Sequence, residues 1–124
     1  GVSLNTFGEN FDFEGKEYVS KNEYSILGSS IDHLINNNIM RIPDYIKIDV
    51  DGIEHLILEG GEETLKNQKI KSILIEINEN FEDQKKQVDK IMKKYGFKLV
   101  QKFIEKNIPV TKQFSNTFNN IYER

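Results

Sequence analysis

The chain has 124 residues, no cysteine and a formal net charge of −3 at pH 7. This length predicts one domain with a single core, and the lack of cysteine excludes disulfides and thiolate metal sites. The charge provides no general attraction to nucleic acid or anionic membrane, and no apolar run is long enough to cross a bilayer. We therefore expect a soluble, cytoplasmic protein with one α/β domain over residues 1–124, and neither a nucleic-acid nor a membrane partner.

The first third of the chain carries the weakest patterns. Residues 1–28 have extended character interrupted by glycine and asparagine, which predicts one or two short strands in a loop-rich segment. Ser29 or Ser30 can then cap a short helix, and the asparagines at 36–38 end it.

The stretch 45–54 is the most informative part of the sequence. Apolar and polar residues alternate along 45–50, and this period of two predicts a strand. Asp51 and Gly52 end the strand, and apolar residues then recur at helical spacing. Asp51 is a candidate N-cap with Glu54 three residues later, which is the spacing of a capping box.

Gly60 and Gly61 end this helix, and two further elements follow. Residues 72–77 are almost all apolar, which is typical of a strand covered on both faces, and Glu76 and Asn78 lie at its carboxyl end. Asn80 can cap the next helix, whose apolar residues follow the helical period. Gly96 stands where a C′ glycine ends a helix.

The remaining residues predict a strand at 97–104, a loop at 108–116 and a last strand at 117–122. The order from residue 45 onward is therefore β-α-β-α-β-loop-β. The short crossovers predict that the first three strands are parallel neighbours. The final loop is too short for a crossover helix, so the last strand should run antiparallel to its predecessor.

Charged residues follow the first of these strands at its carboxyl end, where open α/β sheets bind ligands. Asp49 is the leading candidate for function, because a charge in an interior strand is costly unless it is paired or used. Lys47 can pair with Asp49 or contact a substrate. Asp51 and Glu54 are explained first by helix capping, while Glu76 is a site candidate or a structural polar end. The two histidines have no partner at metal-ligand spacing, so we expect no metal site.

The run PDYIKIDVDGIEHLILEGGEETL, followed by IKSILIEIN and KKYGFKL, resembles the C-terminal half of FkbM-type S-adenosylmethionine-dependent methyltransferases. The signature of that family is Lys-hydrophobic-Asp-Val-Glu/Asp-Gly followed by an early helical Glu. It maps onto Lys47, Asp49, Val50, Asp51, Gly52 and Glu54. Similar stretches at 30–32 and 119–122 extend the resemblance over residues 25–124.

The resemblance implies a partial Rossmann-like class I methyltransferase sheet, mostly parallel with an antiparallel last strand. It also implies S-adenosylmethionine-dependent O-methylation of a hydroxyl on a sugar or small metabolite. Asp49 would orient or deprotonate that hydroxyl, with Lys47 beside it. The residues implied to lie near the substrate or cofactor are Asp51, Gly52, Glu54, Glu76 and Asn78.

The glycine-rich loop and the ribose-binding acid that hold the cofactor in this fold have no counterpart here. Gly8 and Gly15 are isolated in the sequence. We therefore expect a fragment or a degenerate relative that neither binds S-adenosylmethionine nor is active alone. Strand 45–50 would then have an unpaired edge, which predicts either a homodimer through this edge or residues 1–28 folded back as a surrogate strand.

Two other functions remain open. The run IKIDVDG is also similar to the strand that carries the aspartyl nucleophile of haloacid-dehalogenase-type phosphotransferases. Only the helical Glu82 and Asp83 offer the acidic pair that such an enzyme needs downstream. The second alternative is a non-catalytic α/β fragment.

Overall fold

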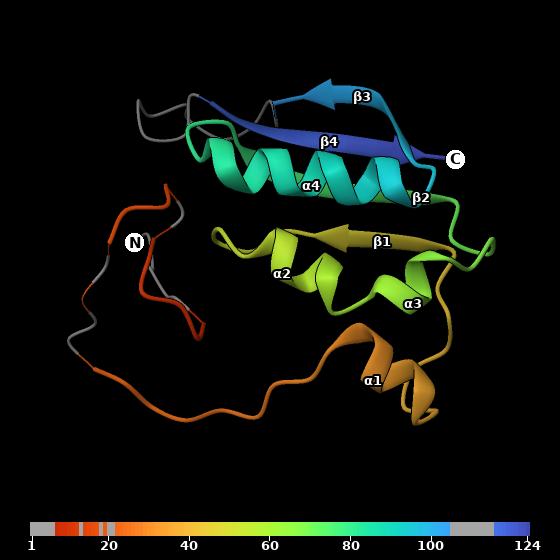
Figure 1. The fold of residues 1–124 in the computed structure, drawn as a ribbon, viewed down its shortest axis with the longest axis horizontal. Helices are drawn as coiled ribbons and strands as arrows, with labels where there is room; N and C mark the ends of the chain where they lie inside the picture. Colours follow the sequence, from red (N-terminus) through yellow and green to blue (C-terminus); the bar gives the residue numbers. More distant parts are fainter. Residues whose placement is uncertain (1–6, 13, 18, 20–21, 105–115) are drawn as a thin grey trace.

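The computed structural model describes residues 7–12, 14–17, 19, 22–104 and 116–124 (Figure 1). These residues form a mixed α/β structure, with all of its helices and strands between residues 31 and 123. The elements in order are α1 (Ile31–Asn36), β1 (Tyr45–Ile48), α2 (Glu54–Glu59), α3 (Glu62–Leu65), β2 (Ser72–Asn78), α4 (Glu82–Lys94), β3 (Lys98–Phe103) and β4 (Thr117–Glu123).

The four strands form one sheet in the order β1-β2-β4-β3. β1 and β2 pair in parallel, while β4 is antiparallel to both β2 and β3, which confirms the antiparallel last strand. The prediction that the first three strands are neighbours was wrong for β3. This strand runs in the same direction as β1 and β2 but lies beyond β4 at the far edge. The crossover through α4 leaves a gap one strand wide, and β4 fills it.

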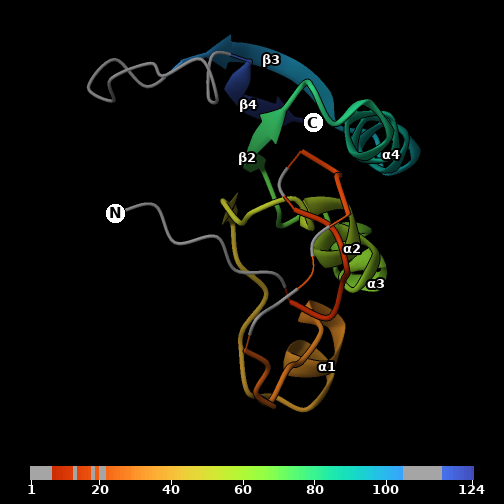
Figure 2. The same cartoon turned by 90° about the vertical axis from the view of Figure 1, so that its left-hand side faces the viewer.

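The core lies between the sheet and the helices α2, α3 and α4, which cover one face of it (Figure 2). The residues of β2 that point to this face are completely buried and meet Leu58 of α2 and Met92 of α4. Leu74 and Glu76 alternate with them and are only half buried. The expectation that β2 is covered on both faces was therefore wrong for the described part of the chain, whose helices lie on one side.

The helix boundaries confirm some of the predicted caps and correct others. The Ser30 hydroxyl accepts a hydrogen bond from the backbone of His33 at the start of α1, and Gly96 follows α4 with a φ of 82°. Asp51 does not cap α2, which begins after Ile53 with no side-chain cap. Gly52, with a φ of 99°, turns the chain between Asp51 and the helix, so the predicted capping box does not form.

α4 begins after Phe81 and also lacks a side-chain cap, so the prediction that Asn80 caps it was wrong. The Asn80 side chain instead accepts a hydrogen bond from Asn116, just before β4. Among the described residues no helix has the length and apolar character needed to cross a membrane.

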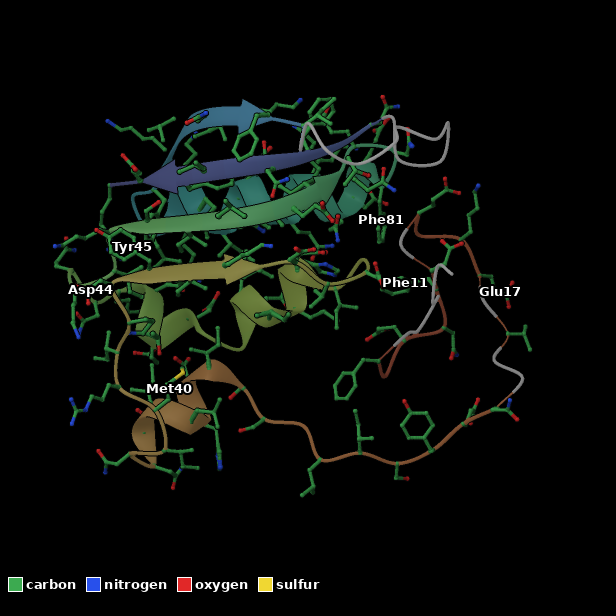
Figure 3. The ribbon with its side chains drawn as sticks, turned by 180° about the vertical axis from the view of Figure 1, so that it is seen from behind. Phe11, Glu17, Met40, Asp44, Tyr45 and Phe81 are labelled. Carbon is green, nitrogen blue, oxygen red and sulfur yellow. The ribbon has the colours of Figure 1, made fainter. Side chains whose placement is uncertain are left out.

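The N-terminal segment contains an isolated bridge between Phe11 and Glu17 but no strand among its described residues. The Phe11 ring lies against Phe81, with centroids 5.5 Å apart, on the side toward which β1 and β2 run (Figure 3). Residues 22–28 are exposed and pair with no strand, so they do not serve as the surrogate strand expected beside β1. The expected extended residues 2–6 and most of the loop at 108–116 lie outside the described residues.

Candidate functional site

A small cavity with a volume of about 30 Å³ lies where β1 and β2 end. It forms because the Asp51–Gly52 turn, the start of α2 and the carboxyl end of β2 meet there. The parallel register of β1 and β2 brings the predicted residues from both strand ends to one place. The predicted residues that line the cavity are Asp51, Gly52, Glu54, Glu76 and Asn78.

Asp49 and Lys47 lie next to this cavity rather than in its lining. The Lys47 ammonium lies 2.6 Å from the Asp49 carboxylate, so the expected ion pair on the strand is present. Since Ile48 pairs with Ile75, Asp49 falls beside Glu76 on the neighbouring strand. A side-chain hydrogen bond joins these two carboxyl groups. The site therefore contains a carboxyl pair that reaches from the open face of the sheet into the cavity.

Burial, the negative charge of Asp49 and the hydrogen bond to Asp49 together raise the pKa of Glu76 to about 7. The positive charge of Lys47 acts in the opposite direction, while Asp51 adds to the increase. Asp51 also has a raised pKa, because of its own burial and the charge of Asp49. Glu76 can therefore hold or release a proton near neutral pH.

Glu54 is only 2% exposed although it is an acid in the first turn of α2. Burial raises its pKa to about 7, while hydrogen bonds from the backbone at Glu54, Gly52 and Val50 act to lower it. The side chain thus holds the turn between β1 and α2 together. Gln84 of α4 also donates a hydrogen bond from Nε2 to the Glu54 carboxylate.

Sequence reasoning missed three residues that line the cavity. Gln84 is 1% exposed, and its Oε1 has no hydrogen-bond partner among the described residues. The sequence could have predicted its burial, because Gln84 lies four residues before Val88 on the buried face of α4, where an apolar residue is expected. The buried Oγ1 of Thr117, at the start of β4, also has no partner there. The residues missed are Val50, Gln84 and Thr117.

The other candidate residues lie away from this cavity. Burial lowers the pKa of His55, and its ring packs edge-on against Phe81. Glu82 and Asp83 form ion pairs with Lys86 on the surface of α4 and do not join the strand-end acids. Among the described residues no group of three or more His, Asp or Glu side chains is arranged to hold a metal ion.

The described residues do not fit the cradle that holds S-adenosylmethionine in class I methyltransferases. Such a cradle needs several glycines in one turn between a strand and a helix, so that the backbone can approach the cofactor closely. Gly52 is the one described glycine between a strand and the helix after it. Gly60 and Gly61 follow α2, and Gly8 and Gly15 lie in the N-terminal segment.

A comparison of the sequence with known protein families gives a match. The family described as the methyltransferase FkbM domain matches residues 4–99 of the chain, which include β1, β2, α4 and the acids at the ends of β1 and β2. No curated protein and no solved structure gives a significant match. The match extends over well more than half of the sequence, and the chain therefore belongs to the FkbM methyltransferase family.

Proposed function

We propose that this chain provides the acceptor side of an S-adenosylmethionine-dependent O-methyltransferase that acts on a hydroxyl of a sugar or small metabolite. Membership of the FkbM family supports methyl transfer as the reaction. The order β1-β2-β4-β3 supports a partial Rossmann-like class I sheet. The observation that carries the choice of acceptor is the carboxyl pair of Asp49 and Glu76 at the strand ends.

A hydroxyl group must lose its proton when its oxygen receives a methyl group. A general base works best when its pKa lies near the operating pH, and the pKa of Glu76 is raised to about 7. In this proposal Asp49 accepts a hydrogen bond from the acceptor hydroxyl, and the Asp49–Glu76 pair takes up its proton. The Lys47 ammonium lies beside the pair and stabilises its negative charge.

S-adenosylmethionine, when bound, supplies the methyl group. Since the described residues do not form its cradle, we expect the 124-residue chain alone to show no binding of the cofactor in calorimetry. Saturable binding at micromolar cofactor would contradict this part of the proposal, because it would require a cofactor site built from other residues.

The catalytic part is tested by fusing the chain to the glycine-loop half of another FkbM methyltransferase and measuring transfer of a labelled methyl group. Asp49→Asn should reduce the rate by about 100-fold or more, as expected when a proton acceptor is lost. Glu82→Gln, which removes an exposed carboxylate on α4, is the matched control and should keep full activity. The wild-type rate should increase as the pH rises through 7. An active Asp49→Asn fusion would reduce Asp49 to a structural role.

A further inference from the structure

We infer that the cavity at the ends of β1 and β2 binds a primary ammonium group. The acceptor would then be a hydroxyl compound that also carries an amine, such as an amino sugar or an amino alcohol. The identity of that molecule rests on the proposed function, whereas binding of the ammonium group does not.

The side chains around the cavity offer mainly hydrogen-bond acceptors. Asp51, Glu54 and Glu76 contribute carboxyl groups from three different segments. Gln84 is the second and independent observation, because it lines the cavity, is completely buried, and has an Oε1 without a partner among the described residues. A buried oxygen without a partner destabilises the folded state. A ligand that donates hydrogen bonds would remove this destabilisation.

The charges favour a cation over a neutral donor. Glu54 and Glu76 repel each other, and Asp49 and Asp51 add further negative charge beside Glu76. Lys47 is the cation next to this group, and it is already engaged by Asp49 at 2.6 Å. α4 and β4 contribute only uncharged side chains to the lining. A hydroxyl group could satisfy the Gln84 oxygen, but an ammonium group would also offset the repulsion between the carboxylates.

The cavity has room for a small head group. A volume of about 30 Å³ is enough for one group the size of a water molecule. A primary ammonium has this size and three N–H donors, whereas a guanidinium is larger and planar. Glu76 both lines the cavity and bonds to Asp49. The amine and the reacting hydroxyl should therefore lie close together on the acceptor.

The first test is a titration of the 124-residue chain with methylammonium chloride, followed through the side-chain amide signals of Gln84 by nuclear magnetic resonance. A ligand with two heavy atoms can at best reach a dissociation constant of about 10 mM. Tetramethylammonium has the same charge but no N–H donor, and methanol is a neutral donor, so neither should give a saturable shift. The affinity for methylammonium should increase by about tenfold between pH 6 and pH 8, because bound cation favours the ionised carboxylates.

Two variants probe the lining. Glu76→Gln removes one charge and Gln84→Met removes the free oxygen while keeping the length of the side chain, and each should weaken methylammonium binding at least fivefold. Glu82→Gln is the matched control and should bind as the wild type does. Equal binding of tetramethylammonium, unchanged binding by Glu76→Gln, or tighter binding of Mg²⁺ than of methylammonium would overturn the inference.

The outcomes also separate this inference from the proposed function. If methylammonium binds as described but the fusion transfers no methyl group to any hydroxyl, the proposed function fails and the ammonium site stands. If the fusion methylates simple alcohols and amino alcohols equally well and methylammonium does not bind, the ammonium site fails and the methyltransferase stands.

Discussion

Ionisation of Glu54 should make the folded protein less stable as the pH increases from about 4.5 to 7. The pKa of this buried carboxyl is about 7 in the folded state and 4.5 in its ordinary range. The folded state therefore keeps a proton that the unfolded state has already lost. The protonated Glu54 therefore stabilises the folded state fully below pH 4.5, and this stabilisation is lost as the pH rises through 7. Since a tenfold change in an equilibrium is worth about 1.4 kcal/mol, the loss amounts to about 3 kcal/mol.

The measurement is urea unfolding of the wild type and Glu54→Gln at pH 5, 6, 7 and 8. Glutamine keeps an oxygen for the hydrogen bond from Gln84 but carries no titratable proton. The free energy of unfolding of the wild type should therefore fall relative to that of the variant by about 2–3 kcal/mol over this range. Glu76 contributes a smaller loss of the same sign to both proteins, because it is half exposed.

Subtracting the two curves also removes the effect of His55. Burial lowers the pKa of that residue, so its contribution to stability increases as the pH rises toward 6.5, opposite to that of Glu54. Both proteins contain His55, and the difference between them isolates Glu54. Parallel curves for the wild type and Glu54→Gln would refute the reasoning, because they would show that Glu54 titrates alike in the folded and unfolded states.

Three further predictions concern stability and assembly. Asp32 accepts hydrogen bonds from Glu63 and Thr64 at the start of α3, so Asp32→Ala should lower the free energy of unfolding by about 1–2 kcal/mol at pH 7 in urea. Because the pKa of Asp32 is lowered, this difference should shrink below pH 4, and an equal difference at pH 3 would contradict it. Arg124 donates hydrogen bonds to the backbone carbonyls of Leu65, Asn67 and Ile70 and lies over the Phe97 ring. Arg124→Ala should therefore lower the free energy of unfolding in urea by about 2 kcal/mol, and Arg124→Lys should lower it by less. The outer edge of β1 has no partner among the described residues, so light scattering should give the mass of a homodimer, whereas a monomer with fast amide exchange along β1 would exclude pairing through that edge.

Local patterns predicted the strands and the long helix after residue 44, because the stretches that form β1, β2 and α4 are rich in regularly placed apolar residues. Glu82–Lys94 buries the side chains that its period of 3.6 selects, whereas Ser72–Asn78 is almost all apolar in sequence but buries mainly alternate residues. The acids at the strand ends were also found, since the parallel pairing of β1 and β2 follows from a single short crossover. Once β1 and β2 pair in parallel, their register places the acids at the two strand ends next to each other.

What the sequence did not show depends on contacts between distant segments. The insertion of β4 between β2 and β3 follows from pairings that a crossover of this length leaves undetermined. Thr117 enters the cavity only because of that insertion. Gln84 was not identified as a site residue, although its spacing from Val88 places it on the buried face of α4. Asp51 failed as a cap because Gly52 turns the chain first.

The place of β4 in the sheet has a consequence for synthesis on the ribosome. Among the described elements this strand comes after β2 and β3 in the sequence, yet it lies between them in the sheet and pairs with both. Until residues 117–123 leave the exit tunnel, β3 has no neighbour in the sheet and β2 is paired on one side only. Pairings between segments so far apart form late because they must first close a long loop. The nascent chain should therefore stay sensitive to proteases until residues 117–123 have emerged and paired with β2 and β3.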